Sequence, residues 1–392
     1  MSTLAALHDQ TTDHVKSKIN YFLENNHLPS PCLIVDLDQI RTQYQRFVTC
    51  FPKATICYAV KANPAPEILE TLAQKDGSYF DVASLSEISA VLKQGVSPSR
   101  LSYGNTIKKE NDIKRAYALG VRVFTFDSSE ELAKIARSAP GSEVFCRVLC
   151  DCGGADWPLS RKFGCSPDMA LWLMKEAASM GFRACGLAFH VGSQQGDVLA
   201  YDRVIDLAAH LSQELKVHGI ILSALNIGGG FPAHSTKYTP PLESYAAAIE
   251  ESLLLRFGGQ HPRIILEPGR GLVGNAGILQ SEIVLISQKS FDPHEPRWIY
   301  LDIGKFGGLI ETMDEAIRYP LRTQHDGGPT APCVIAGPTC DSADTLYEKV
   351  PYELPLALKI GDKVFIESTG AYTTTYSSVG FNGFPPLPAF YI

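Results

Sequence analysis

The sequence lacks several features that mark particular classes of protein. No apolar stretch approaches the roughly 20 residues of a membrane-spanning helix, and residues 1–26 have no apolar core of the signal-peptide type. No run of lysine or arginine forms a basic patch, and the formal net charge of −7 argues against nonspecific binding to nucleic acid. We therefore expect a cytoplasmic protein that binds neither membranes nor nucleic acid, with a helical segment in residues 1–30.

The chain is also not organised around disulfides, although it contains ten cysteines. Most of them are scattered through apolar stretches of a long chain, which is typical of a reducing compartment. One group is closer together, but its Cys-x-Cys spacing is poor for zinc and two members lie in or at the end of a strand-like run; it comprises Cys146, Cys150, Cys152 and Cys165. We predict no metal site.

What the chain does have is a regular alternation of short apolar runs and stretches of helical period. Its 392 residues are enough for a large barrel with an appended domain. The predicted strands are Thr55–Val60, Tyr79–Val82, Leu101–Gly104, Val121–Phe126, Val144–Leu149, Cys185–Phe189, Ala224–Ile227 and Arg263–Leu266. The predicted helices are Leu37–Phe51, Ala65–Gln74, Leu85–Lys93, Glu110–Leu119, Ser129–Arg137, Pro167–Met180, Ala200–Val217 and Leu242–Phe257.

This alternation predicts an α/β fold, a (β/α)8 barrel of the TIM type over residues 31–270. An open sheet that binds a dinucleotide should show Gly-x-Gly-x-x-Gly after an early strand, and none appears there. Beyond residue 270 the helical stretches nearly vanish, which predicts a β domain of sandwich or Greek-key type over residues 271–392. Its predicted strands are Ser281–Ser287, Arg297–Asp302, Cys333–Ala336, Leu356–Ile360 and Lys363–Glu367.

Polar residues lie at or just after the carboxyl end of nearly every predicted barrel strand. Active sites of such barrels form where the carboxyl ends of the strands meet, so these side chains should gather at one mouth. Any single member could still be a structural neighbour of a loop. The residues are Lys61, Asp81, Asn105, Asp127, Arg147, His190, Ser193, Gly228–Gly230, Glu267 and Arg270.

Six motifs, in order along the chain, make the sequence similar to a known family. They are Tyr58-Ala-Val-Lys-Ala-Asn-Pro64, His190-Val-Gly-Ser193, Gly228-Gly-Gly-Phe-Pro232, Glu267-Pro-Gly-Arg270, Gly337-Pro-Thr-Cys-Asp-Ser342 and Gly370-Ala-Tyr372. Together they resemble the ornithine/diaminopimelate decarboxylases, which are fold-type III pyridoxal-phosphate enzymes. The resemblance is greatest to the compact bacterial ornithine decarboxylases, some of which also accept lysine. It implies pyridoxal 5'-phosphate as the cofactor.

The resemblance assigns roles to residues at the predicted barrel mouth. Lys61 would bind the cofactor covalently, which requires a partly neutral amine. Glu267 would keep the pyridine nitrogen protonated so that the ring can accept electrons. His190 would stack on the ring, and Asp81 and Arg147 would lie near the lysine and its supporting charges. Without the motifs, a lysine after a strand is usually a solvated charge, and Glu267 an ordinary ion-pair partner.

The phosphate contacts implied by the resemblance are Ser193, Gly230, Gly269, Arg270 and Tyr372. Glycines allow the backbone to approach an anion, and a helix beginning after the loop 228–230 would add its amide dipole. A glycine triplet alone is more often just a turn.

The β domain carries the remaining residues that the resemblance implies. Cys340 would protonate the substrate carbon after carbon dioxide leaves, and Asp341 would bind its distal ammonium, both acting in the partner subunit's barrel. Such sharing requires at least a homodimer. A cysteine in a small-residue loop is otherwise usually inert packing.

A second stretch of the β domain bears on substrate choice. Asp314 is the best match for the family's aspartate that contacts the distal amine, although Glu311 lies one turn away and a small shift of alignment would exchange them. Phe306 replaces the usual tyrosine, so the hydroxyl contact from that position is missing. Phe381 is the remaining residue that is expected to contact the substrate. The choice between ornithine and lysine stays open.

The resulting expectation is decarboxylation of L-ornithine to putrescine, with L-lysine to cadaverine as a second activity, since one methylene is worth only about 1–3 kcal/mol. Diaminopimelate decarboxylase is the alternative, disfavoured because its second carboxylate would meet the anions of Cys340-Asp-Ser-Ala-Asp344. A racemase would need a second proton donor that is not identifiable. A non-catalytic regulator that binds a partner protein should have lost its lysine, its cysteine or its phosphate contacts, yet Lys61, Cys340, Glu267 and Arg270 are all present.

Overall fold

The computed structural model describes residues 18–75, 77–150, 153–157 and 162–392. The chain divides into two compact units, which we call the barrel unit and the β unit. The barrel unit comprises the described residues within 41–232 and 240–272; the β unit comprises residues 18–40, 233–239 and 273–392. Among the described residues, no helix is both long and apolar enough to cross a membrane.

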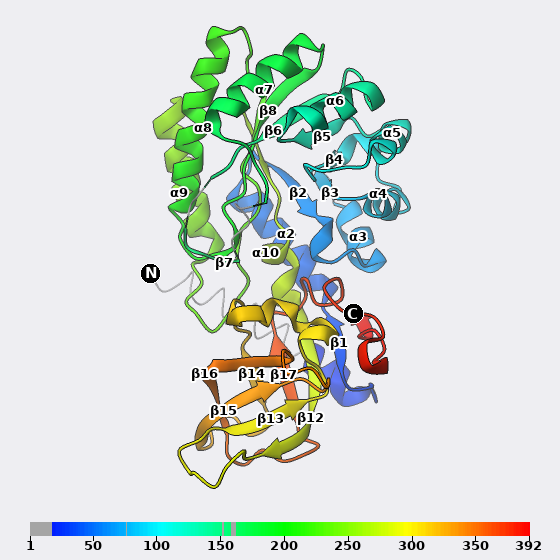
Figure 1. The fold of residues 1–392 in the computed structure, drawn as a ribbon, viewed down its shortest axis with the longest axis vertical. Helices are drawn as coiled ribbons and strands as arrows, with labels where there is room; N and C mark the ends of the chain where they lie inside the picture. The colour runs from blue at the N-terminus through cyan, green and yellow to red at the C-terminus, as the bar shows by residue number, and fades with distance from the viewer. Residues whose placement is uncertain (1–17, 76, 151–152, 158–161) are drawn as a thin grey trace. The chain divides into compact units, whose positions relative to one another are not determined.

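The barrel unit is built on eight parallel strands that close into a barrel, as the sequence predicted (Figure 1). Their order around the barrel follows the chain, and small, aliphatic and aromatic side chains such as Cys57, Ile265 and Phe145 form a buried cluster in this unit. The strands are β2 (Thr55–Ala59), β3 (Ser78–Val82), β4 (Leu101–Tyr103), β5 (Val123–Phe126), β6 (Glu143–Arg147), β8 (Arg183–Ala188), β10 (Ala224–Asn226) and β11 (Arg263–Leu266).

Helices follow the strands, as expected for this fold. Three of them begin at a serine whose hydroxyl accepts a backbone N–H of the first turn: Ser84, Ser128 and Ser166. This local chemistry sets where each helix leaves its loop. The helices are α2 (Leu37–Cys50), α3 (Pro66–Ala73), α4 (Leu85–Leu92), α5 (Glu110–Ala118), α6 (Ser129–Ser138), α7 (Pro167–Ser179), α8 (Ala200–Val217), α9 (Leu242–Phe257) and the short α10 (Arg270–Val273). A two-stranded sheet, β7 (Ala155–Trp157) with β9 (Ser193–Gln195), is also present.

The β unit is organised around one sheet whose central strand is long. Strand β12 pairs with β1 and β17 along its first half and with β13 along its second half. The strands are β1 (Cys32–Val35), β12 (Gly277–Ser287), β13 (Arg297–Leu301), β14 (Leu321–Thr323), β15 (Thr330–Ala336), β16 (Thr345–Pro355), β17 (Lys363–Glu367) and β18 (Ala389–Tyr391).

Three features of the β unit differ from the sequence prediction. Residues 31–40 were assigned to the barrel, but β1 pairs antiparallel with β12 and parallel with β18, which places it in the β sheet. The predicted strand Leu356–Ile360 is wrong, because the carboxylate of Asp362 accepts the N–H of Lys359 and closes a turn there. The real strand is β16, which runs just before it.

The described part of the predicted N-terminal helix covers residues 18–25, and it packs on the β unit. Ile19 contributes to a cluster with Cys32, Ile34 and Ile278, flanked by Phe390 from the last strand. Residues 1–17 of the predicted segment lie outside the described residues. This cluster ties both ends of the described chain into one small core.

Candidate active site

The lysine of the first motif lies on a short turn directly after strand β2. Val60–Ala62 form a single 3-10 turn, and Lys61 Nζ donates to Asp81 Oδ2 at 3.0 Å. Asp81 lies on the neighbouring strand β3, where it is in register with Ala59 of β2. The lysine side chain is 44% exposed, whereas that of Asp81 is 4% exposed. The amine can therefore reach a ligand from outside while its counter-ion stays fixed inside the barrel.

The position of Asp81 depends on a glycine across the sheet. A Cβ at Gly104 would lie only 2.0 Å from Asp81 Oδ1, so this position has no room for a side chain. The same oxygen is buried and has no hydrogen-bond partner in the part of the chain that the structure describes. A buried acceptor without a partner costs free energy, which makes Asp81 receptive to a polar or cationic group of a ligand.

A second carboxylate, Glu267, follows strand β11 and accepts a short hydrogen bond from Asn226 Nδ2. Burial is the main cause that raises the pKa of Glu267 to about 7, with the charge of Asp81 adding to it and the charges of Lys61 and Arg147 opposing it. A carboxyl with such a pKa exchanges its proton near neutral pH. It is therefore suited to share a proton with a basic ring nitrogen.

His190 is held as a neutral ring beside the glycine loop. Its Nδ1 accepts the N–H of Gly192 at 3.0 Å, which leaves the proton on Nε2. Burial and the cations of Arg147 and Lys61 lower the pKa of His190 well below its usual value. A neutral, fixed imidazole can lie against an aromatic ligand without adding charge.

The guanidinium of Arg147 lies 5.0 Å from the ring centre of Phe163, and burial lowers the pKa of Arg147.

The glycine loop after β10 is locked against its neighbours. Gly228 and Gly230 have φ angles of +71° and +99°, and a Cβ at either would approach a backbone oxygen within 2.3 or 2.7 Å. Tyr201 Oη donates to the carbonyl of Gly229 at 2.8 Å. The loop is thus a rigid concave turn with bare backbone, the kind of surface that an anion can approach.

The expected helix after this loop is absent. Residues 231–241 are irregular, and the next helix along the chain, α9, begins only at Leu242. Arg270 is 4% exposed and donates from Nε and Nη2 to Ser193 Oγ at 3.4 Å, so a cation and a hydroxyl lie together there. Gly269 is the buried residue before it.

Two residues predicted for the barrel mouth, Asp127 and Asn105, accept hydrogen bonds from backbone N–H groups of loops. Asp127 Oδ2 accepts the N–H of Gly164 at 2.8 Å, and Asn105 Oδ1 accepts that of Ile107 at 3.3 Å. Sequence reasoning missed Asn226, whose amide links Glu267 to the N–H of Gly228 at 2.9 Å. Its place just before the glycine triplet was the only available signal.

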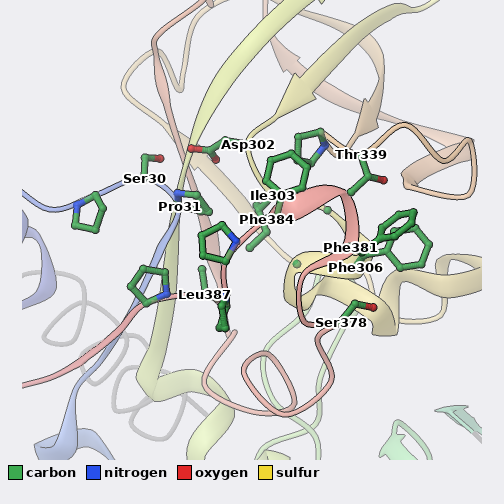
Figure 2. A pocket seen from close by; sticks show the side chains of 17 residues that line it. Ser30, Pro31, Asp302, Ile303, Phe306, Thr339, Ser378, Phe381, Phe384 and Leu387 are labelled. Carbon is green, nitrogen blue, oxygen red and sulfur yellow. The ribbon is translucent and has the colours of Figure 1, made fainter.

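The β unit has its own cluster of predicted site residues. Phe306 and Phe381 pack edge to face with ring centres 5.1 Å apart, and both line an apolar pocket with Ile303 and Phe384 (Figure 2). Cys340 is exposed and bonds to Asn382, the residue after Phe381. These residues come from separate segments, and the fold brings them to one region of the unit.

The acidic residues of the β unit separate into exposed and structural groups. Asp341 is exposed, and its Oδ1 accepts the N–H of Ala343 at 2.9 Å. Asp344, which the sequence treated as a pocket anion, is 1% exposed and fully engaged with Thr339 and the N–H of Lys305, so it does not face a ligand.

The side chain of Asp314 is 85% exposed and lies 3.4 Å from Lys349 Nζ. Glu311 is 4% exposed and accepts a hydrogen bond from Tyr319 Oη at 3.4 Å. Tyr372, with a φ of +60°, packs its ring against Tyr376.

The cysteine group contains no cluster of metal ligands among the described residues. The sulfurs of Cys146 and Cys165 are 3.7 Å apart, and Cys150 Sγ donates to the carbonyl of His190 at 3.3 Å. Cys152 lies outside the described residues.

Comparison with known proteins agrees with this geometry. Residues 37–274 match the pyridoxal binding domain of the pyridoxal-dependent decarboxylases. The lysine/ornithine decarboxylase of Selenomonas ruminantium is 36% identical over 92% of this chain and 89% of its own length. A crystal structure of lysine/ornithine decarboxylase from Vibrio vulnificus, complexed with cadaverine, superimposes with a TM-score of 0.83 at 33% identity, covering 96% of this chain and 98% of the other.

A third relative is not named as an enzyme. Antizyme inhibitor 2 of Xenopus laevis is 32% identical over 91% of this chain and 80% of its own length. The match of the family model covers more than half of the chain and includes the barrel with Lys61, Asp81 and Glu267. The chain belongs to the family of pyridoxal-dependent decarboxylases.

Proposed function

We propose that this chain decarboxylates L-ornithine to putrescine and carbon dioxide, with L-lysine to cadaverine as a second reaction. The observation that carries the proposal is the pair of carboxylates at the barrel mouth: Asp81 contacts the amine of Lys61, and Glu267 is partly buried with its pKa raised to about 7. This is the arrangement that a pyridoxal-phosphate enzyme needs. The names of the relatives support the choice of substrates.

The residues of the barrel mouth fit the cofactor. Lys61 would hold it covalently, Glu267 would hold a proton at the ring nitrogen, and His190 would lie against the ring. The phosphate would be held by Arg270 with Ser193, Gly230 and Gly269. The buried, unpartnered oxygen of Asp81 and the bare backbone of the glycine loop are the observations that favour this fit.

The side chains of the barrel mouth would have different roles in the reaction. When bound, pyridoxal phosphate supplies a conjugated ring that accepts the electron pair left as carbon dioxide departs. Glu267 supports that acceptance by holding the proton at the nitrogen, and Arg147 adds a positive charge that favours the ionised form of Glu267. Asp81 keeps Lys61 oriented toward the mouth, and neutral His190 leaves the local charge unchanged.

For the distal amine of the substrate, the exposed carboxylates are better placed than the buried ones. Asp314 contacts Lys349 at 3.4 Å, and a contact between two exposed side chains is weak and easily exchanged. Glu311 is bound inside the unit, so we assign Asp314 rather than Glu311 to the amine. With Asp341 also exposed, the region favours a cationic side chain over the second carboxylate of diaminopimelate.

We further propose a homodimer in which Cys340, Asp341 and Phe381 serve the partner's barrel. The test is complementation: Lys61→Ala and Cys340→Ala proteins are dissociated, mixed and reassociated. If sites are shared, mixed dimers contain one site with both residues intact, and activity returns above that of either variant alone. Mixtures that stay as inactive as their components would contradict shared sites.

The function is tested with four substrates in separate reactions: L-ornithine, L-lysine, L-arginine and meso-diaminopimelate. We expect putrescine with stoichiometric carbon dioxide from ornithine, and a slower release of cadaverine from lysine. Lys61→Ala is the matched control, since it keeps the barrel and removes the amine. Release of no carbon dioxide from any basic amino acid, with cofactor added, would refute the proposal and favour a regulatory protein.

A further inference from the structure

The side chain of Asn382 holds Cys340 by two hydrogen bonds that no motif predicted. The backbone N–H of Cys340 donates to Asn382 Oδ1 at 3.0 Å, and Asn382 Nδ2 donates to Cys340 Sγ at 3.1 Å. The residues are 42 positions apart in the chain, so this contact, the Cys340–Asn382 clamp, joins two separate loops of the β unit. One amide thus fixes both the backbone and the sulfur of the cysteine.

Asn382 has a backbone conformation that glycine would adopt more easily. Its φ is +51°, in the left-handed region that favours glycine, and it lies between Gly380 and Gly383, which have φ of +76° and +79°. Asparagine tolerates this conformation better than most residues, but it still costs more than glycine. The adjacent ring of Phe381 packs on Phe306, which anchors the turn from the other side.

The geometry points to Asn382 as a positioning residue for proton transfer from Cys340, an inference that rests on the proposed function. In that step the S–H bond breaks, a C–H bond forms at the carbon that lost carbon dioxide, and the negative charge passes to sulfur. The amide N–H of Asn382 is aimed at that sulfur and stabilises the charge as it develops. A solvent proton then restores the thiol.

Two substitutions distinguish stabilisation of charge on the sulfur of Cys340 from mere structural support of its loop. Asn382→Asp keeps an oxygen that can accept the N–H of Cys340, but it replaces the donor on sulfur by an anionic oxygen. Asn382→Gly removes both hydrogen bonds while suiting the left-handed backbone. If Asn382 only braces the loop, the Asp variant should behave as the wild type. If it stabilises charge on sulfur, the Asp variant should be the more impaired of the two.

Two measurements are made on the full-length holoenzyme. The first is the ratio of amine to aldehyde formed from ornithine, because a misdirected proton yields aldehyde. The second needs no turnover: the rate at which iodoacetamide labels Cys340, followed by peptide mass, reports the reactive thiolate. We expect both the ratio and the rate to fall about tenfold in Asn382→Asp and by less in Asn382→Gly. Wild-type values in Asn382→Asp would overturn the inference.

Cys340→Ala distinguishes failure of the inference from failure of the proposed function. If Cys340→Ala changes the product ratio while both Asn382 variants match the wild type, the inference alone is overturned. If Cys340→Ala leaves rate and products unchanged, Cys340 leaves the mechanism and the inference falls with it. If the wild type releases no amine, the proposed function fails. The labelling experiment still tests the clamp in that case, because a wild-type labelling rate in Asn382→Asp would overturn its effect on the sulfur.

Discussion

The partly buried carboxyl of Glu267 predicts an unusual dependence of stability on pH. Its pKa rises from an ordinary 4.5 to about 7, chiefly through burial. A carboxyl with a higher pKa in the folded state binds its proton more tightly there, so the fold loses stability as pH rises from about 4.5 to about 7 and levels off above. Because one pKa unit is worth about 1.4 kcal/mol, the full loss is about 3 kcal/mol.

Glu267→Gln removes this ionisation and keeps an oxygen for the amide of Asn226. In cofactor-free protein we expect the variant to exceed the wild type in free energy of unfolding by up to about 3 kcal/mol near pH 8, and by little near pH 5. The assay is urea unfolding followed by fluorescence at several pH values. The variant should nevertheless lose decarboxylase activity, because the amide cannot supply the carboxylate.

Glu243 provides a control of opposite sign in the same unit. It pairs with Arg46 at 2.6 Å, and this hydrogen-bonded contact lowers its pKa. A lowered pKa contributes stability that is present above the unfolded pKa and is lost as pH falls, so Glu243→Gln should be less stable than the wild type near pH 8. Equal urea midpoints for wild type and Glu267→Gln near pH 8 would refute the reasoning about Glu267.

Three further predictions concern the cofactor and the substrate. Lys61→Ala should abolish turnover with an unchanged circular dichroism spectrum, and borohydride should trap no cofactor adduct; steady activity would exclude this lysine. Gly230→Ala, which places a Cβ 2.7 Å from a backbone oxygen, should weaken cofactor binding about tenfold in a fluorescence titration, and unchanged affinity would contradict a tight loop. Asp314→Asn should raise the KM for ornithine about tenfold with little change in kcat. Glu311→Gln should lower the thermal stability and leave the KM for ornithine unchanged. If Glu311→Gln raises KM and Asp314→Asn does not, the two roles must be exchanged.

The barrel was predictable because its pattern is local. All eight predicted strands are confirmed to within a few residues, since they are short buried runs and most of them are followed by a helix of clear period. The β unit was less predictable because its pairing is nonlocal. Strand β16 contains Glu348, Lys349 and two prolines, which hide it from pattern reasoning, and β1 finds its partners more than 240 residues away.

The candidate site shows the same division. Lys61, Asp81 and Glu267 lie at or just after the carboxyl ends of strands, so their convergence could be expected. Whether an acidic residue is buried could not be read from sequence, and the structure alone separates exposed Asp314 from Glu311. The amides of Asn226 and Asn382 were missed because a hydrogen bond between distant loops leaves no pattern in the chain.

The pairing of β1 with both β12 and β18 imposes an order on biosynthesis. Residues 32–35 emerge from the ribosome early, yet their neighbours, residues 277–280 and 389–391, are made late. The barrel can begin to assemble while translation continues, whereas this three-strand seam closes only after residue 391 has left the exit tunnel. A fragment that starts at residue 271 would lack its middle strand, leaving β12 and β18 with unpaired edges.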